Sequence, residues 1–187
     1  VQAQINQDCR TAAIGCIDCK KLVADKMVER MAPMWEARAS LMSHPSRKGE
    51  VPLAEDWFRK NGYRIARLRD RGATFEGMGD ALWHPGRRLL WGGHGFRTGP
   101  EIFPEIAQTL QTPVAQLKLV NERYFYLQTC FCPLTQEAAL VYPPALDTGS
   151  LELVLKLFPI VLTVEEQEAR RGLACMAAAV ASKTAIL

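Results

Sequence analysis

Apolar and polar positions divide the chain into a helical first part and a mixed second part. After Asp18, which can cap a helix, apolar side chains recur at loosely helical spacing. Pro33 should interrupt this helix, because proline lacks a backbone donor and clashes with the preceding turn. The polar stretch 43–49 contains proline and glycine and has the composition of a linker. The pattern therefore predicts a helical segment at residues 1–47 and a separate domain at residues 50–187.

The second part alternates between strand-like and helix-like patterns. Expected helices cover residues 53–61, 100–110, 151–157 and 165–175. Expected strands cover residues 63–68, 80–84, 88–92, 114–120, 125–130, 137–142, 160–164 and 183–187. The order strand, strand, helix, strand occurs about twice, which indicates a modular α/β architecture. Glycines lie in or beside strands and not between a strand and a helix, so a doubly wound nucleotide-binding fold is disfavoured.

Composition and charge narrow the class of protein. The chain has 187 residues, of which 48% are hydrophobic and 23% charged, values that are ordinary for a globular domain. No apolar run approaches the ~18–20 residues that span a bilayer, so no membrane partner is expected. The net charge of +3 is too small to indicate nucleic acid, and the basic run 59–71 is interpreted as a solvated face. No secretory signal is visible, so we expect a cytoplasmic protein with reduced cysteines.

The six cysteines fall into different kinds. Cys9, Cys16 and Cys19 have the spacing C-x6-C-x2-C, and a C-x-x-C pair at a helix start directs two thiolates toward one metal. Three thiolates do not complete a tetrahedral site. We interpret them as unused thiols and expect no cofactor; the alternative is an iron–sulfur cluster or zinc ion that is shared with another chain or completed by an external ligand. Cys130 and Cys132 alternate along an expected strand and are interpreted as small buried hydrophobes.

The segment 9–38 resembles the C-terminal region of bacterial tryptophanyl-tRNA synthetases, in its cysteines and in the residues that follow them. This resemblance implies that a fourth cysteine of an iron–sulfur cluster would lie before Val1. No ATP-binding signature of that family is present, so aminoacylation is excluded.

Three motifs in the second part point to a different family. They are TFEGMGDALWH at 74–84, LWGGHGFRT at 90–98 and RYFYLQTCFCPL at 123–134. Through these motifs residues 53–187 resemble the amidinotransferase and arginine-deiminase superfamily. The resemblance implies a pentein, an α/β propeller of ββαβ-type modules, of which this chain holds about half. The chain thus looks like a chimera of two fragments, a partial pentein with an N-terminal helical appendage.

The resemblance assigns three residues to substrate binding. Asp80 would pair with a guanidinium ion and Glu76 would support it, because the planar cation needs carboxylates opposite its NH groups. Arg97 would bind the carboxylate of an arginine-like substrate. The alternative is that Glu76 and Asp80 only fix a glycine-rich turn. His84 and His94 flank the expected hairpin and are interpreted as structural or exposed.

Two positions depart from the family pattern. Tyr126 stands where the family has its general acid/base histidine, and Gln128 replaces an aspartate. A phenol, with an ordinary pKa of about 10, is a poor proton shuttle near neutral pH. The family's nucleophilic cysteine would lie beyond the equivalent of Leu187. Cys175 aligns with a non-catalytic cysteine, so we do not expect it to act as a substitute nucleophile.

These departures lead to an expected function. We expect a catalytically inactive relative of guanidino-modifying enzymes that acts as a structural or binding module. An incomplete propeller exposes sheet edges, so we also expect a homo-oligomer, with a guanidino compound as the possible ligand. One alternative is an amidinohydrolase or amidinotransferase acting on arginine-like substrates. The other is a metal-binding or redox module that uses the N-terminal cysteines.

Overall fold

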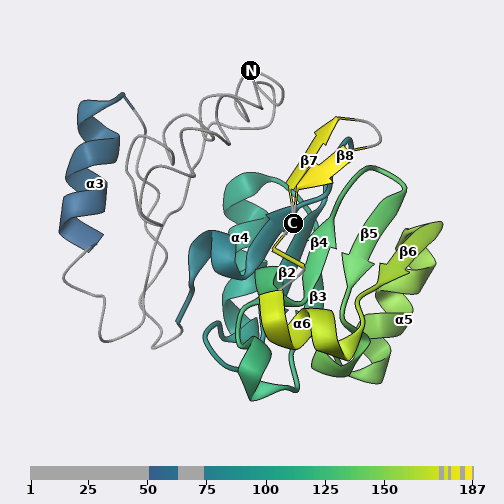
Figure 1. Cartoon of the computed structure of the whole chain (residues 1–187). Coiled ribbons are helices and arrows are strands. Elements are labelled where there is room, and N and C mark those ends of the chain that lie inside the picture. The colour runs from purple at the N-terminus through teal and green to yellow at the C-terminus, as the bar shows by residue number, and fades with distance from the viewer. Residues whose placement is uncertain (1–50, 63–73, 173–174, 177, 182–183, 187) are drawn as a thin grey trace. The chain divides into compact units, whose positions relative to one another are not determined.

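The computed structural model describes residues 51–62, 74–172, 175–176, 178–181 and 184–186. The helical segment expected at 1–47, with its three cysteines, lies outside these residues, and so does the strand expected at 63–68. The described part is a mixed α/β structure with small sheets (Figure 1).

Residues 81–118 form a ββαβ unit, the first module. Its elements are β1 (Ala81–Trp83), β2 (Leu90–His94), α4 (Phe103–Leu110) and β3 (Val114–Lys118). Strand β2 lies in the middle of the sheet, antiparallel to β1 and parallel to β3. The 3-10 helix η3 (Gly77–Gly79) precedes β1, and η4 (Pro100–Ile102) precedes α4. Helix α4 packs closely on β2, because a Cβ atom at Gly92 would lie only 2.5 Å from the Phe103 ring.

Residues 131–163 repeat this order and form the second module. Its elements are β4 (Phe131–Pro133), β5 (Ala138–Val141), α5 (Thr148–Leu157) and β6 (Ile160–Thr163). Strand β5 lies between an antiparallel β4 and a parallel β6. The 3-10 helix η6 (Leu127–Thr129) precedes β4, as η3 precedes β1. The prediction that the order strand, strand, helix, strand occurs twice is confirmed.

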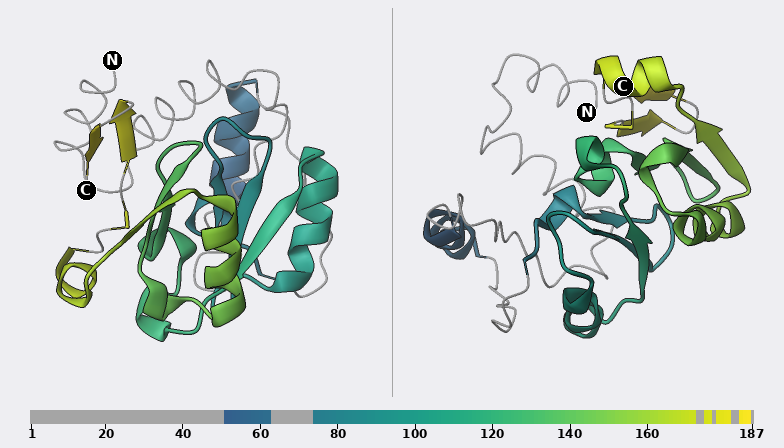
Figure 2. Two further views of the ribbon diagram at one scale, coloured as in Figure 1. Left: turned by 90° about the vertical axis from the view of Figure 1, so that its right-hand side faces the viewer. Right: turned by 90° about the horizontal axis from the view of Figure 1, so that it is seen from below.

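Helix α5 lies against strands of both modules, next to β3 and to β6 (Figure 2). Asp147 caps its N-terminus, since Oδ1 accepts a hydrogen bond from the Ser150 N–H at 2.8 Å. The Ser150 hydroxyl oxygen in turn accepts a hydrogen bond from the Lys118 N–H at 2.7 Å. The start of α5 therefore satisfies a backbone donor on the outer edge of β3 and joins the two modules.

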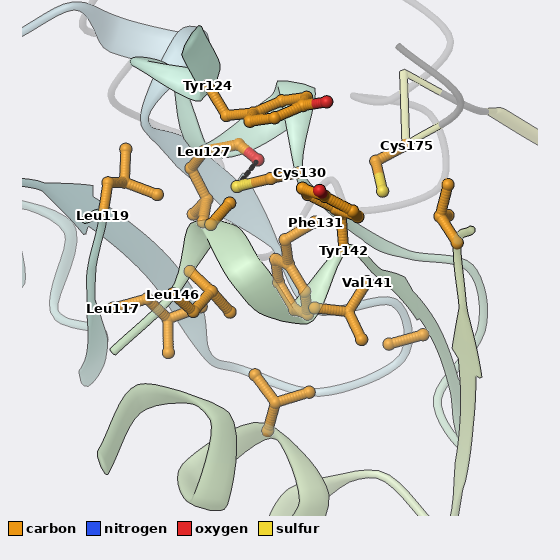
Figure 3. Close-up of a cluster of buried hydrophobic side chains, with 14 of the residues drawn as sticks. Leu117, Leu119, Tyr124, Leu127, Cys130, Phe131, Val141, Tyr142, Leu146 and Cys175 are labelled. Atoms are coloured by element: carbon orange, nitrogen blue, oxygen red, sulfur yellow. Dashed lines mark hydrogen bonds between the residues drawn. The ribbon is translucent and has the colours of Figure 1, made fainter. Parts of the chain in front are cut away.

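The larger of two hydrophobic clusters in the described residues runs through both modules (Figure 3). Trp91 on β2 is fully buried; its ring meets Phe131 edge-on at 5.1 Å and stacks with Phe158 at 5.4 Å between ring centres. The His84 ring stacks on Phe158 at 4.6 Å, and its Nδ1 accepts a hydrogen bond from Trp91 Nε1 at 3.2 Å. Its Nε2 lies 3.0 Å from the Gln136 carbonyl oxygen. Burial lowers the pKa of His84, so this histidine is a neutral structural residue of the core.

The remaining elements are α3 (Val51–Lys60), η5 (Glu122–Tyr124), η7 (Pro143–Ala145), α6 (Glu166–Gly172), β7 (Ala178–Ala181) and β8 (Thr184–Ile186). The strand expected at 125–130 is wrong. The Thr129 N–H donates to the Tyr126 carbonyl at 3.0 Å, which closes a turn where a strand would stay extended. Segment 125–130 therefore holds η6, and the strand begins after it.

The described elements bear on two expectations, the fold class and the presence of a membrane-spanning helix. The mixed α/β class is supported by the two ββαβ modules, while the propeller arrangement remains a prediction. Within the described ranges, no helix is both long and apolar enough to cross a membrane.

Candidate functional site

Asp80 is a fully buried carboxylate between η3 and β1. Its Oδ2 accepts a hydrogen bond from the Thr98 hydroxyl at 2.7 Å, and its Oδ1 accepts one from the Leu127 N–H at 2.9 Å. Gly93 leaves room for this arrangement. A Cβ atom at that position would lie 3.2 Å from Asp80 Oδ1 and 2.5 Å from Leu127 Cβ. The carboxylate is thus fixed by donors from two segments that are distant in the sequence.

The charge of Asp80 is set by opposing effects. Burial raises its pKa from 3.8 to about 6, because removal from water disfavours the charged form. The hydrogen bonds from Thr98 and Leu127 act in the other direction, since they stabilise the ionised form. Glu76 raises the pKa further, and Arg97 lowers it. The carboxyl is therefore ionised at neutral pH and becomes protonated as the pH falls through about 6.

Glu76 is a second buried carboxylate of the same loop. Its Oε2 accepts a hydrogen bond from the Tyr126 hydroxyl at 3.1 Å. Its backbone N–H donates to the Thr98 hydroxyl oxygen at 3.2 Å, and that hydroxyl donates in turn to Asp80. Thr98 therefore connects the loop that carries both carboxylates to the segment that follows β2.

Arg97 brings a positive charge to the same place. Its guanidinium carbon lies 4.8 Å from the centre of the Phe125 ring and 5.8 Å from that of Tyr126, within the range of a cation–π contact. Its carbonyl oxygen accepts a hydrogen bond from the Thr74 hydroxyl at 2.6 Å. The structure thus gathers Arg97 and Tyr126 around the two carboxylates, Glu76 and Asp80.

Three contributors to this site were not assigned from the sequence. Thr98 lies inside a quoted motif, and its place directly after Arg97 was the available signal. Gly93 is the second of two adjacent glycines on β2, which could have indicated a close approach of another segment. The Leu127 N–H gave no signal, because every residue except proline carries this donor.

The second module places a thiol where the first module has Asp80. The N–H of Asp80 and that of Cys130 both close a 3-10 helix, at 3.0 Å from the carbonyls of Gly77 and Leu127. Each residue also accepts a hydrogen bond from the central strand region, from Gly93 at 2.7 Å and from Tyr142 at 2.8 Å. The two modules therefore match residue by residue at this corner.

The two buried thiols of the described residues, Cys130 and Cys175, do not offer a ready nucleophile. Cys130 is fully buried, its Sγ lies 3.5 Å from the Leu127 carbonyl oxygen, and burial raises its pKa well above the usual range (Figure 3). Burial also raises the pKa of Cys175 to about 12. Both groups are thiols at neutral pH, and only the thiolate attacks carbon well. Cys130 is the buried hydrophobe that the sequence predicts, whereas Cys132 is only half-buried.

The other described histidine, His94, ends β2 and is half-buried. Burial lowers its pKa. Its carbonyl oxygen accepts a hydrogen bond from the Leu119 N–H at 2.8 Å, a contact that fixes the strand and not a ligand. Within the described residues, no cluster of three or more histidine, cysteine or acidic side chains is placed to hold a metal ion. Cys9, Cys16 and Cys19 lie outside those residues.

Comparisons with known proteins agree with the motifs. No family model matches the chain. The bifunctional arginine dihydrolase/ornithine cyclodeaminase ArgZ of Synechocystis is 42% identical over 116 residues, which are 62% of this chain and 16% of that protein. The dimethylarginine dimethylaminohydrolase of Mycobacterium tuberculosis is 37% identical over 125 residues, which are 67% of this chain and 40% of that protein.

A solved structure of one of these relatives is also similar to this chain in its fold. It is the N-terminal domain of ArgZ, an arginine dihydrolase, as a cysteine-to-serine mutant with substrate bound. It matches with a TM-score of 0.69 and 41% identity, and the match covers 73% of this chain and 51% of that one. These results support homology to the arginine dihydrolases and the dimethylaminohydrolase, which belong to the pentein superfamily. The chain spans 16% of the length of the first curated relative and about half of the solved domain.

The similarity to tryptophanyl-tRNA synthetases is short. The tryptophan–tRNA ligase of Thermotoga maritima is 53% identical over 30 residues, only 9% of its length. A fusion of two fragments therefore remains a prediction.

The expectation of a catalytically inactive structural or binding module is wrong. The relatives that match include hydrolases of arginine or dimethylarginine by name, and one of these is solved with its substrate bound. The expectation rested on Tyr126 and on a nucleophile beyond the equivalent of Leu187. Tyr126 changes one side chain of a site that keeps both carboxylates. Because the chain spans only part of its relatives, its last residue is no evidence that a nucleophile is missing. The hydrolytic alternative is the better supported one.

Proposed function

We propose that the carboxylate site forms the guanidinium-binding part of an amidinohydrolase that acts on arginine or an arginine-like guanidino compound. The observation that carries the proposal is the geometry of Asp80, a buried carboxylate with both oxygens held by the protein, in a chain of which 116 residues are 42% identical to an arginine dihydrolase. A buried carboxylate is costly unless a cation or several donors compensate it. Asp80 is therefore suited to a cationic ligand.

The chemistry of a guanidinium ion matches this arrangement. The ion is planar and directs N–H donors to its edges, and carboxylate oxygens accept such donors in short, charge-assisted hydrogen bonds. Each Asp80 oxygen that already accepts one hydrogen bond retains capacity for another. Glu76 supplies the second negative charge. Arg97 supplies a positive charge for the carboxylate of an arginine-like substrate.

The proton-transfer step distinguishes this chain from its family. Tyr126 offers a hydroxyl donor where the family histidine offers an imidazole that changes charge near neutral pH. A phenol with an ordinary pKa of about 10 transfers protons slowly at that pH. We therefore assign no proton transfer to Tyr126, and the part of the function that this chain can be tested for is binding of the guanidino compound.

A binding assay tests the function. The purified chain is titrated with L-arginine at pH 7.5 in a calorimeter. We expect binding that Asp80→Asn weakens at least about tenfold, the effect of losing one charged hydrogen-bonding partner. Circular dichroism of the variant checks that it is folded. Equal affinity of the wild type and Asp80→Asn, or no binding by either, would overturn the proposal.

A further inference from the structure

Two consecutive residues of the segment before β4 hold the two carboxylates of the site. Leu127 donates its N–H to Asp80 Oδ1 at 2.9 Å, and Tyr126 donates its hydroxyl to Glu76 Oε2 at 3.1 Å. The first contact uses a backbone donor, which any residue except proline supplies. The second uses a tyrosine hydroxyl, at the position where the family resemblance places a histidine. The contact with Glu76 therefore requires a tyrosine at this position, whereas the contact with Asp80 requires only the backbone.

The Tyr126 side chain is held in place from several directions. The Tyr126 carbonyl accepts hydrogen bonds from the Thr129 N–H at 3.0 Å and from its hydroxyl at 2.6 Å, which fixes the start of η6. The ring passes close to Gly79, where a Cβ atom would lie 3.0 Å from Tyr126 Cδ1. The Phe125 ring lies 4.6 Å away between centres. These contacts fix the ring and therefore the position of its hydroxyl beside Glu76.

We propose that Tyr126 is a positioning residue that orients the Glu76 carboxylate for the guanidinium ion. The proposal rests on the function proposed above. A carboxylate on the flexible side chain of a glutamate has several rotamers, and fixing one of them before the ligand arrives removes an entropic cost of binding. The hydroxyl can remain bound to Oε2 while the guanidinium is bound, because each carboxylate oxygen accepts more than one hydrogen bond. Tyr126 acts through Glu76 and not by contact with the ligand.

A double-mutant cycle on ligand binding tests this role. The dissociation constant for L-arginine is measured by calorimetry for the wild type, Tyr126→Phe, Glu76→Ala and the double variant. Tyr126→Phe keeps the ring and removes only the hydroxyl, and we expect it to weaken binding about fivefold, since a hydrogen bond to a charged group is lost. In the Glu76→Ala background the same change should have no effect, because interacting residues are not additive.

Tyr124→Phe is the matched control. It removes another tyrosine hydroxyl of the same segment, one that is buried and has no hydrogen-bond partner within the described part of the chain. We expect no change in affinity. An equal loss from Tyr126→Phe in both backgrounds would show a general structural effect and would overturn the positioning role.

A second cycle, on stability, needs no ligand. Urea unfolding of the same four proteins should show that the loss of the hydroxyl lowers the folding equilibrium constant about fivefold only when Glu76 is present. Additive effects would overturn the proposal even if arginine binds. A wild-type chain that binds no arginine would instead overturn the proposed function, and the stability cycle would still decide whether Tyr126 holds Glu76.

Discussion

At the residue scale, the site depends on a carboxyl group that is buried and nevertheless charged at neutral pH. Burial raises the pKa of Asp80, and the hydrogen bonds from Thr98 and Leu127 lower it. The pKa is higher in the folded chain than the ordinary value of 3.8, so ionisation of Asp80 costs folding stability above about pH 6. The cost disappears as the pH falls from about 6 toward 4. A bound cation would offset this free-energy cost at neutral pH, so ligand binding should increase the stability of the folded chain.

The first prediction concerns pH. Affinity for L-arginine should be constant above pH 7 and fall as the pH drops through about 6, approaching a tenfold loss per pH unit, because only the ionised form of Asp80 attracts the cation. Glu76 and Arg97 are the charged groups that face Asp80 and contribute to this titration. Calorimetric titrations between pH 5 and 8 measure it. Asp80→Asn should bind weakly at every pH, and a wild-type affinity that stays level down to pH 5 would refute the assignment.

The sequence predicts which residues belong to the site but not every contact between them. Glu76, Asp80 and Arg97 lie in the motifs that the family resemblance picks out, and the structure brings them together. The Tyr126 hydroxyl contact with Glu76 is not readable in advance, because it joins residues 50 positions apart. Local patterns of apolar and polar residues specify elements, and contacts between distant side chains depend on how those elements pack.

At the element scale, the site forms where η6 crosses the sheet of the first module. Its first residue, Leu127, packs against Gly93 on β2 so closely that no side chain fits between them. The alternation of apolar residues across 125–130 predicts a strand, yet the structure has η6. Alternation arises in this segment because Leu127 and Thr129 are buried while Gln128 is half-buried, and a 3-10 turn can produce this pattern as well as a strand.

The second prediction tests this crossing. Gly93→Ala should lower the free energy of unfolding by about 1–3 kcal/mol, because the new Cβ atom would lie 2.5 Å from Leu127 Cβ. It should also weaken arginine binding, since Leu127 must shift away from Asp80. Gly149→Ala in α5 is the control: no atom lies within 4 Å of its added Cβ, and alanine favours a helix, so stability should stay equal or rise. Urea unfolding compares them, and equal stability of the Gly93→Ala variant and the wild type would contradict the packing.

At the scale of the whole molecule, the chain contains two matched ββαβ modules and spans about half of the solved arginine dihydrolase domain. The repeated order of elements was readable from the sequence, because each module buries its own alternating strands and amphipathic helix. The way in which the two modules pack on each other could not be predicted from the sequence, since it depends on the surfaces between them. Helix α5 shows this dependence, because the hydroxyl oxygen of Ser150 in its first turn accepts a hydrogen bond from Lys118 on β3 of the other module.

The third prediction concerns self-association. Strand β6 is an edge strand of its sheet, and its Ile160 and Leu162 are 51% and 49% exposed. Exposed apolar side chains on an open edge favour pairing with another chain. We expect light scattering after size exclusion to show oligomers that the double variant Ile160→Lys, Leu162→Lys reduces. A monomeric wild-type chain at all concentrations would contradict this expectation.

The central claim is that the two carboxylates recognise the positive charge of a guanidinium group. Calorimetry with L-arginine and with L-citrulline tests it most directly, because citrulline has the same shape and carries an uncharged ureido group. At pH 7.5 we predict at least about tenfold tighter binding of arginine by the wild type, a preference that Asp80→Asn removes. Equal affinity of the wild type for both compounds, or binding of neither, would contradict the claim.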